Sequence, residues 1–124
     1  MRNAPRSMIE LSTADKEGDY EMRPHYADYV KHAMRFYAKN RMNASSEQPR
    51  FRSEADKKNW EACKSAISTF DAENQDILLS IYVEDDNIVE CINRAAKRER
   101  ISADRIWNLV NELEKKVAKR RGLI

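Results

Sequence analysis

Seven polar residues between positions 104 and 119 would share one side of a helix if that segment is helical: Asp104, Arg105, Asn108, Asn111, Glu112, Lys115 and Lys119. Asn and Arg side chains can make paired hydrogen bonds with the edges of nucleic-acid bases, and Lys suits phosphate groups. Solvated surface helices carry the same residue types. The pattern therefore leaves two readings open, a nucleic-acid contact and an ordinary polar surface.

Other candidate sites have less support. His25 and His32 could share a helix face, but no cysteine or further histidine lies near them, so we expect surface histidines rather than a metal site. Residues 84–87 are acidic but lack the alternating ligands and central glycine of a calcium loop. Cys63 and Cys91 are isolated, and we expect two buried thiols. We expect no catalytic residue, no metal and no cofactor.

Composition excludes several classes of protein. The chain has 124 residues, a length typical of one domain, and a formal net charge of +2. No glycine occurs between Gly18 and Gly122. Phosphate-binding loops, dinucleotide fingerprints and nucleophile elbows all require glycine, so these are excluded, and an all-β fold is disfavoured. With no long apolar run, we expect a cytoplasmic protein without membrane contact.

Hydrophobic spacing predicts five helices connected by short loops. They run from Pro24 to about Met42, over 54–70, from after Asp71 to about Tyr82, over 88–97 and over 103–121. Ser53, Asp71 and Ser102 are the predicted N-caps, and either Asp86 or Asn87 caps the fourth helix. Residues 43–49 are polar and predicted as a loop, and residues 1–23 as an arm or weakly ordered segment.

Each predicted helix has one apolar face. The expected core residues from the second helix onward are Trp60, Cys63, Ile67, Phe70, Ile77, Leu78, Ile81, Tyr82, Ile88, Cys91, Ile92, Ala95, Ala96, Ile106, Leu109, Val110, Leu113 and Val117. In the first helix, Tyr26, Tyr29, Phe36 and Tyr37 are also expected in the core, with base stacking as the alternative.

Charge is segregated along the chain. Residues 54–93 hold three lysines and ten acids, a net charge of −7, whereas residues 94–121 hold ten bases and four acids, a net charge of +6. The basic part contains a short apolar helix, a tight connection, a Ser cap and a long basic helix. This order is the outline of a helix-turn-helix, a motif that binds DNA.

Residues 71–124 resemble region four of sigma-70-type factors, and most closely the small sigma-like regulators of phages and integrative elements of the ArpU and RinA type. The stretch DAENQDILLSIY follows the rhythm of that family's first helix, E-R-x-I-L-x-L-x-Y. The later stretch RISADRI contains the family's [IV]-S-x-x-[ER]-[IV] at Ile101, Ser102, Arg105 and Ile106. The resemblance implies a recognition helix over 103–121.

Two departures from the family pattern affect this reading. The family usually has glycine in the turn, whereas this chain has Arg98-Glu99-Arg100-Ile101, so we expect a longer or wider turn. The family commonly has Arg or Gln on the first exposed turn of the recognition helix. Here those positions are Ala103, Asp104, Trp107 and Asn108. Asn108 can bind adenine, Asp104 can accept from cytosine or stabilise the helix start, and Trp107 faces either the groove or the protein.

We therefore expect an all-α protein with a C-terminal helix-turn-helix at 71–124, an N-terminal helical part at 24–70 and an arm at 1–23. The expected function is non-catalytic, sequence-specific DNA binding by a transcriptional regulator of a phage or mobile element, with contact to RNA polymerase and homodimer formation left open. The alternative is a helical protein-interaction or self-assembly module. Base-facing residues are expected to be Ala103, Asp104, Arg105, Trp107, Asn108 and Asn111, and phosphate-binding residues Arg98, Arg100, Lys115, Lys119 and Arg120.

Overall fold

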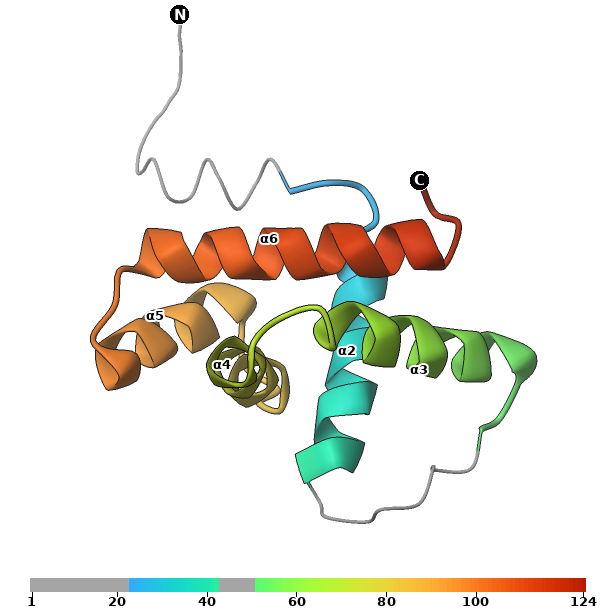
Figure 1. Cartoon of the computed structure of the whole chain (residues 1–124), viewed down its shortest axis with the longest axis horizontal. Helices are drawn as coiled ribbons and strands as arrows, with labels where there is room; N and C mark the ends of the chain where they lie inside the picture. The colour runs from blue at the N-terminus through green and yellow to red at the C-terminus, as the bar shows by residue number, and fades with distance from the viewer. Residues whose placement is uncertain (1–22, 43–50) are drawn as a thin grey trace, which may run out of the picture.

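A computed structural model of the chain describes residues 23–42 and 51–124, and in these residues every regular element is an α-helix (Figure 1). The elements are α2 (Ala27–Met42), α3 (Glu54–Ile67), α4 (Ala72–Tyr82), α5 (Ile88–Glu99) and α6 (Ala103–Arg120). The expected all-α fold is confirmed. The predicted loop at 43–49 and the predicted arm, apart from Arg23, fall outside the described residues.

Side-chain caps begin the last four helices. The Ser53, Asp71 and Ser102 side chains each accept a hydrogen bond from the backbone N–H three residues later, at 3.2, 2.9 and 3.1 Å. At α5 the choice between two caps is resolved, because Asn87 accepts from the backbone N–H of Val89 at 2.8 Å. The predicted starts of these four helices are therefore confirmed, with a physical cause for each, whereas the first helix begins at Ala27 and not at Pro24 as predicted.

Helix ends differ from the prediction by a few residues. The second helix was expected to reach Phe70, but α3 ends at Ile67, and Phe70 lies in the connection to α4 while still being buried. In the other direction, α5 continues to Glu99, two residues beyond the predicted end. Lys97 and Arg98 in its last turn interact favourably with the helix dipole, so these cations extend the helix rather than ending it.

Helix α6 lies along one side of the bundle, with α5 beneath one half and α3 beneath the other (Figure 1). Helix α2 runs away from α6 beside α3, and α4 lies between α5 and α2. The long helix therefore has one face on the bundle and one face directed away from it.

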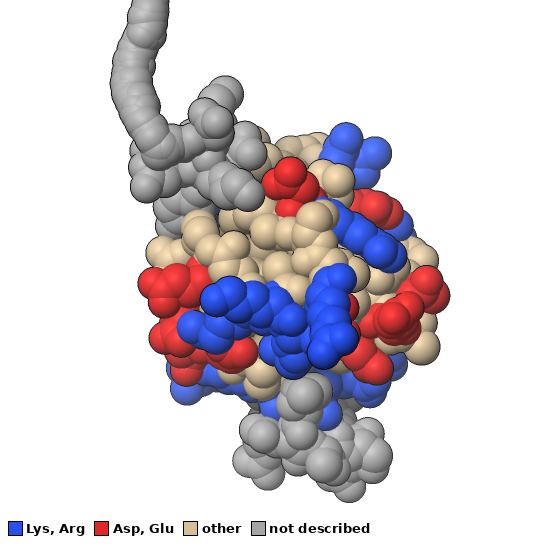
Figure 2. Space-filling view, turned by 90° about the vertical axis from the view of Figure 1, so that its left-hand side faces the viewer, with Lys and Arg blue, Asp and Glu red and all other residues tan. Residues whose placement is uncertain are grey.

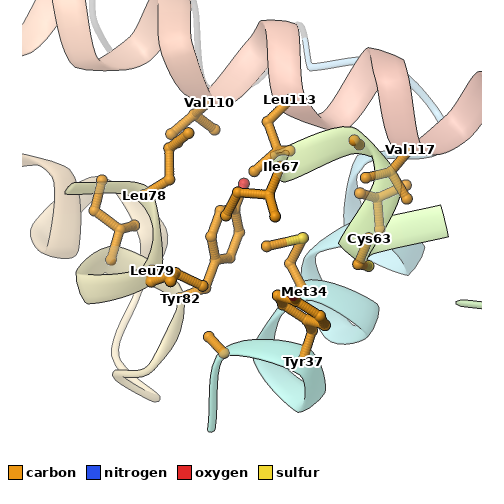
Figure 3. Packing of buried hydrophobic residues seen from close by; sticks show 14 of the residues in the cluster. Met34, Tyr37, Cys63, Ile67, Leu78, Leu79, Tyr82, Val110, Leu113 and Val117 are labelled. Atoms are coloured by element: carbon orange, nitrogen blue, oxygen red, sulfur yellow. The ribbon is translucent and has the colours of Figure 1, made fainter. Parts of the chain in front are cut away.

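Side chains from all five described helices form the core, part of which is shown in Figure 3. Val110 and Leu113 of α6 point toward Leu78 and Tyr82 of α4, whereas Val117 points toward Cys63 of α3 (Figure 3). The N-terminal helices contribute Met34 and Tyr37 of α2 and Cys63 and Ile67 of α3 to the same core (Figure 3). One hydrophobic core thus connects the N-terminal helices with the C-terminal ones.

The predicted apolar faces are buried in α3, α4, α5 and α6, although Ala96 and Leu109 are only partly so. The aromatic prediction for α2 is right for Tyr37, which is buried, whereas Tyr26 packs against the core only in part. It is wrong for Tyr29 and Phe36, which are 44% and 39% exposed. The buried face of α2 runs instead through small and flexible residues: Ala27, Val30, Met34 and Ala38. Among the described helices, none has the length and apolar character needed to cross a membrane.

Candidate functional site

Helices α5 and α6 are joined by a short connection, residues 100–102. The tight connection predicted between these two helices is therefore present. Arg100 adopts the left-handed conformation with φ of 59°, a region in which a side chain is strained and glycine is favoured. Its own N–H and that of Ile101 both donate to the carbonyl of Ala96, which closes the end of α5. An arginine therefore stands where the sigma-like pattern has glycine.

The outward face of α6 is exposed along its whole length. The exposed residues are Asp104, Arg105, Asn108, Asn111, Glu112, Lys115 and Lys119. The opposite face buries Ile106, Val110, Leu113 and Val117. Two predicted base-facing residues, Ala103 and Trp107, lie at the edge between these faces and are half-buried.

Cations gather where α5 ends and α6 begins. Figure 2 shows Lys and Arg side chains grouped in the middle of this end of the molecule, with acidic side chains on both sides. The exposed cations of these two helix ends, called the turn cluster below, are Lys97, Arg98, Arg100 and Arg105. The turn cluster includes Arg105, which lies in the first turn of α6. The cluster and the outward face of α6 therefore form one continuous polar surface.

The five predicted phosphate-binding residues differ in what they contact. Arg98 donates to Ser80 Oγ at 2.7 Å and to Glu99 Oε2 at 3.1 Å, and Arg120 donates to Ser65 Oγ at 2.8 Å. The side chains of Arg100, Lys115 and Lys119 make no hydrogen bond or ion pair with another described residue, and all three are exposed. Within the described residues, these three cations therefore have no polar partner that an external anion would have to displace.

A groove of about 720 Å³ runs beside the outward face of α6. The segment before α2 forms one wall, and α6 forms the other; the lining residues are Arg23, Pro24, Tyr26, Asp104, Trp107, Asn108, Asn111 and Lys115. We call it the α6 groove. Four of the predicted base-facing residues, Asp104, Trp107, Asn108 and Asn111, therefore border a hollow and not only a convex surface.

Beneath this groove lies a buried ion pair that the sequence analysis missed. The Arg23 guanidinium pairs with the carboxylate of Glu114, which is 1% exposed, and lies 5.5 Å from the ring centroid of Trp107. The Tyr82 hydroxyl donates to the other Glu114 oxygen at 2.5 Å. Burial raises the pKa of Tyr82, so the phenol keeps the proton it donates. A signal existed in the sequence, since Glu114 lies four residues after Val110 on the apolar side of α6.

The acidic residues between α4 and α5 are held by cations of the same chain. Arg94 pairs with Glu84 and with Asp86, the latter at 2.8 Å, and Lys39 of α2 pairs with Asp85. The Lys39 ammonium lowers the pKa of Asp85. Much of the negative charge in this loop is therefore neutralised within the molecule.

A second groove of about 700 Å³ lies between α2 and the start of α3. It contains His25 and His32, the latter 3.6 Å from Asp28, together with the exposed rings of Tyr29 and Phe36. Within residues 23–42 and 51–124, no three potential metal-ligating side chains of His, Cys, Asp or Glu come together. Of the two histidines, His32 thus stands beside a carboxylate, and neither belongs to a cluster of ligands within the described residues.

Comparison with known proteins adds no relative: no family model, curated protein or solved structure matches the chain.

Proposed function

We propose that the chain is a non-catalytic DNA-binding protein that lays the outward face of α6 in the major groove of a duplex. The observation that carries this proposal is the exposed polar face of α6, which continues into the turn cluster at the end of α5. An α-helix fits the major groove, and a helix start directed at the bases is the usual arrangement of helix-turn-helix proteins.

Base contacts are assigned to the first half of α6. Arg105 can donate two hydrogen bonds to guanine, and Asn108 can bind adenine by one donor and one acceptor. Asn111 lies one helical turn further along the same face and extends the contact. Ala103 and Asp104 border this face, whereas Trp107, half-buried beneath Arg23, contributes by shaping its edge.

Phosphate contacts are assigned to cations on both sides of these residues. Arg100 at the turn and Lys115 and Lys119 further along α6 are exposed, and their side chains make no hydrogen bond or ion pair with another described residue. Arg120 is held by the Ser65 hydroxyl, which orients its guanidinium group without neutralising it, whereas Arg98 is held by the Ser80 hydroxyl and also pairs with Glu99. Such contacts supply affinity through release of counterions from DNA.

The resemblance to sigma-like regulators of phages and integrative elements supports a role in transcription. If that role is correct, binding selects a particular operator, and the helices α2 and α3 serve assembly or contact with RNA polymerase. Sequence-specific regulation requires DNA binding, so DNA affinity is tested before the choice of operator.

The alternative, self-association of the acidic middle segment with the basic end of another copy, has less support. Three acids of that segment, Glu84, Asp85 and Asp86, are already paired within the chain. Sedimentation at two salt concentrations distinguishes the two functions. A salt-sensitive oligomer that lacks DNA affinity would favour self-association.

Fluorescence anisotropy with a labelled duplex of about 20 base pairs tests the proposed function. We expect binding at about 50 mM salt and a decrease of log K with log salt of slope about −4.5 if all five assigned cations contact phosphates. Absence of binding at that salt concentration, or binding without a salt dependence, contradicts the proposal.

A further inference from the structure

The α6 groove lies where the described chain begins. Arg23 is its first described residue, and this arginine both lines the groove and is anchored below it by Glu114. The side chain of Arg23 is 10% exposed, so its position is set by the buried ion pair rather than by solvent. The described part of the chain therefore begins at the wall of this groove.

The residues that immediately precede this point are acidic. Positions 15–21 read DKEGDYE, with four acids against one lysine, a formal charge of −3. On the groove side, Lys115 lines the hollow, and Arg105 and Lys119 are exposed on the same face of α6. Asn108 and Asn111 add amide groups that can bind the backbone of an extended chain. An acidic segment thus directly precedes Arg23 in the chain, and Arg23 lines a groove whose other wall carries a cation and two backbone-binding amides.

We propose that the acidic segment 15–21 docks along the α6 groove and competes there with DNA. In this arrangement its carboxylates meet the cations that would otherwise contact phosphates. The ion pair of Arg23 with Glu114 tethers the segment beside the groove. A tether raises the local concentration of the docked segment, so even weak contacts suffice to occupy the groove.

The lengths involved permit this contact. Arg23 lies over Trp107, and Lys115 and Lys119 are eight and twelve residues further along α6. At about 1.5 Å per residue these lysines are about 12 and 18 Å from Trp107 along the helix axis. Seven extended residues span up to about 24 Å, so acids of 15–21 reach either lysine.

Docking of the segment stands independently of DNA, whereas competition rests on the proposed function. The experiment therefore has two arms on the full chain. In the first, a zero-length carbodiimide reagent joins carboxylates to lysine amines, and mass spectrometry identifies the joined pairs. We expect links from Lys115 or Lys119 to acids of 15–21 within one monomer, and their loss when a duplex of about 20 base pairs is added.

The second arm compares two variants with the same change in charge. The first neutralises the segment by Asp15→Asn, Glu17→Gln, Asp19→Asn and Glu21→Gln. The control neutralises four exposed acids of α3 and α4 by Glu54→Gln, Glu61→Gln, Glu73→Gln and Asp76→Asn. We expect the first to bind the duplex more tightly than the control by at least about fivefold, the lower end of typical coupling between sites.

The outcomes separate the two claims. Absence of links within the monomer, or links found only in cross-linked dimers, overturns docking of the segment. Links that persist when DNA is bound, or equal affinities of the two variants, overturn competition. If the protein forms these links within the monomer but binds no DNA, docking of the segment stands and the proposed function is wrong.

Discussion

The hydroxyl of Tyr82 on α4 donates a 2.5 Å hydrogen bond to the carboxylate of Glu114 on α6, and both residues are buried. The same carboxylate pairs with Arg23, ahead of α2. Three separate parts of the chain are thus joined at one buried charge. A buried carboxylate is stable only while its partners remain, because transfer from water to the interior carries a large desolvation cost.

Arg23→Met should destabilise the fold. It removes the counter-charge of Glu114 and leaves a buried carboxylate with one hydrogen bond, which costs about 3 kcal/mol of unfolding free energy. Urea unfolding followed by circular dichroism measures this loss. The double variant Arg23→Met/Glu114→Leu should recover most of it, since no buried charge then remains unpaired. A loss for Arg23→Met no larger than that for Arg105→Met, an exposed arginine, would contradict the account.

Arg100→Gly should stabilise the protein relative to Arg100→Ala. Residue 100 has φ of 59°, where a Cβ atom costs about 1 kcal/mol and glycine is unstrained. Both substitutions remove the same cation, so the two variants should lose DNA affinity equally while differing in their urea midpoints. Equal stability of the two variants would show that the turn does not hold the left-handed conformation in solution.

The free energy of unfolding should decrease in alkaline solution because the Cys63 thiol ionises more readily in the unfolded state. Burial raises the pKa of this thiol to about 12 from an ordinary value of 9.0. Below pH 9 the Cys63 thiol keeps its proton in both the folded and the unfolded state. Between pH 9 and about pH 12 the thiol loses its proton in the unfolded state but keeps it in the folded state. The unfolding free energy therefore decreases by up to about 1.4 kcal/mol for each pH unit in that window.

Cys63→Ala tests this effect, because the variant has no thiol to titrate in either state. The substitution also removes the smaller repulsion between a Cys63 thiolate and the Tyr37 and Tyr82 phenolates, which acts in the same direction. Urea unfolding at about pH 8 and about pH 10.5 should show a smaller alkaline loss for the variant than for the parent protein. Identical losses would mean that the thiol reaches solvent in the folded state.

Asn108→Ala and Lys119→Gln should weaken DNA binding in different ways. Loss of the Asn108 amide should relax the preference at one base pair by about 1–3 kcal/mol, whereas loss of Lys119 should weaken all sequences similarly and reduce the salt slope by about 1. Selection from a random duplex pool, followed by anisotropy on the selected and scrambled sites, measures both. A uniform effect of Asn108→Ala would place this residue outside the base contacts.

Most of the fold was predictable because local chemistry determines it. Ser53, Asp71 and Ser102 begin helices by satisfying backbone N–H groups, and that signal is short-range. The burial of Leu113 and Val117 followed from spacing of period 3.6. Such features need no knowledge of which helix packs on which.

The buried ion pair was not predictable in the same way. Glu114 and Arg23 are 91 residues apart, and a glutamate in a basic helix is typical of a surface position. Only the placement of the segment before α2 against α6 brings them together. The α6 groove depends on the same long-range placement, so the sequence showed one wall of it and not the other.

The most direct test of the central claim compares two triple variants in the same DNA titration. The first, Lys97→Gln, Arg100→Gln and Arg105→Gln, neutralises three exposed cations of the turn cluster; the control, Lys57→Gln, Lys58→Gln and Lys64→Gln, neutralises three exposed cations of α3. Both change the net charge equally. The account predicts that the first loses at least about tenfold in affinity at about 100 mM salt, with a shallower salt slope, while the control changes little. Equal losses in the two variants would show that DNA is attracted by overall charge and that α6 and its turn form no specific surface.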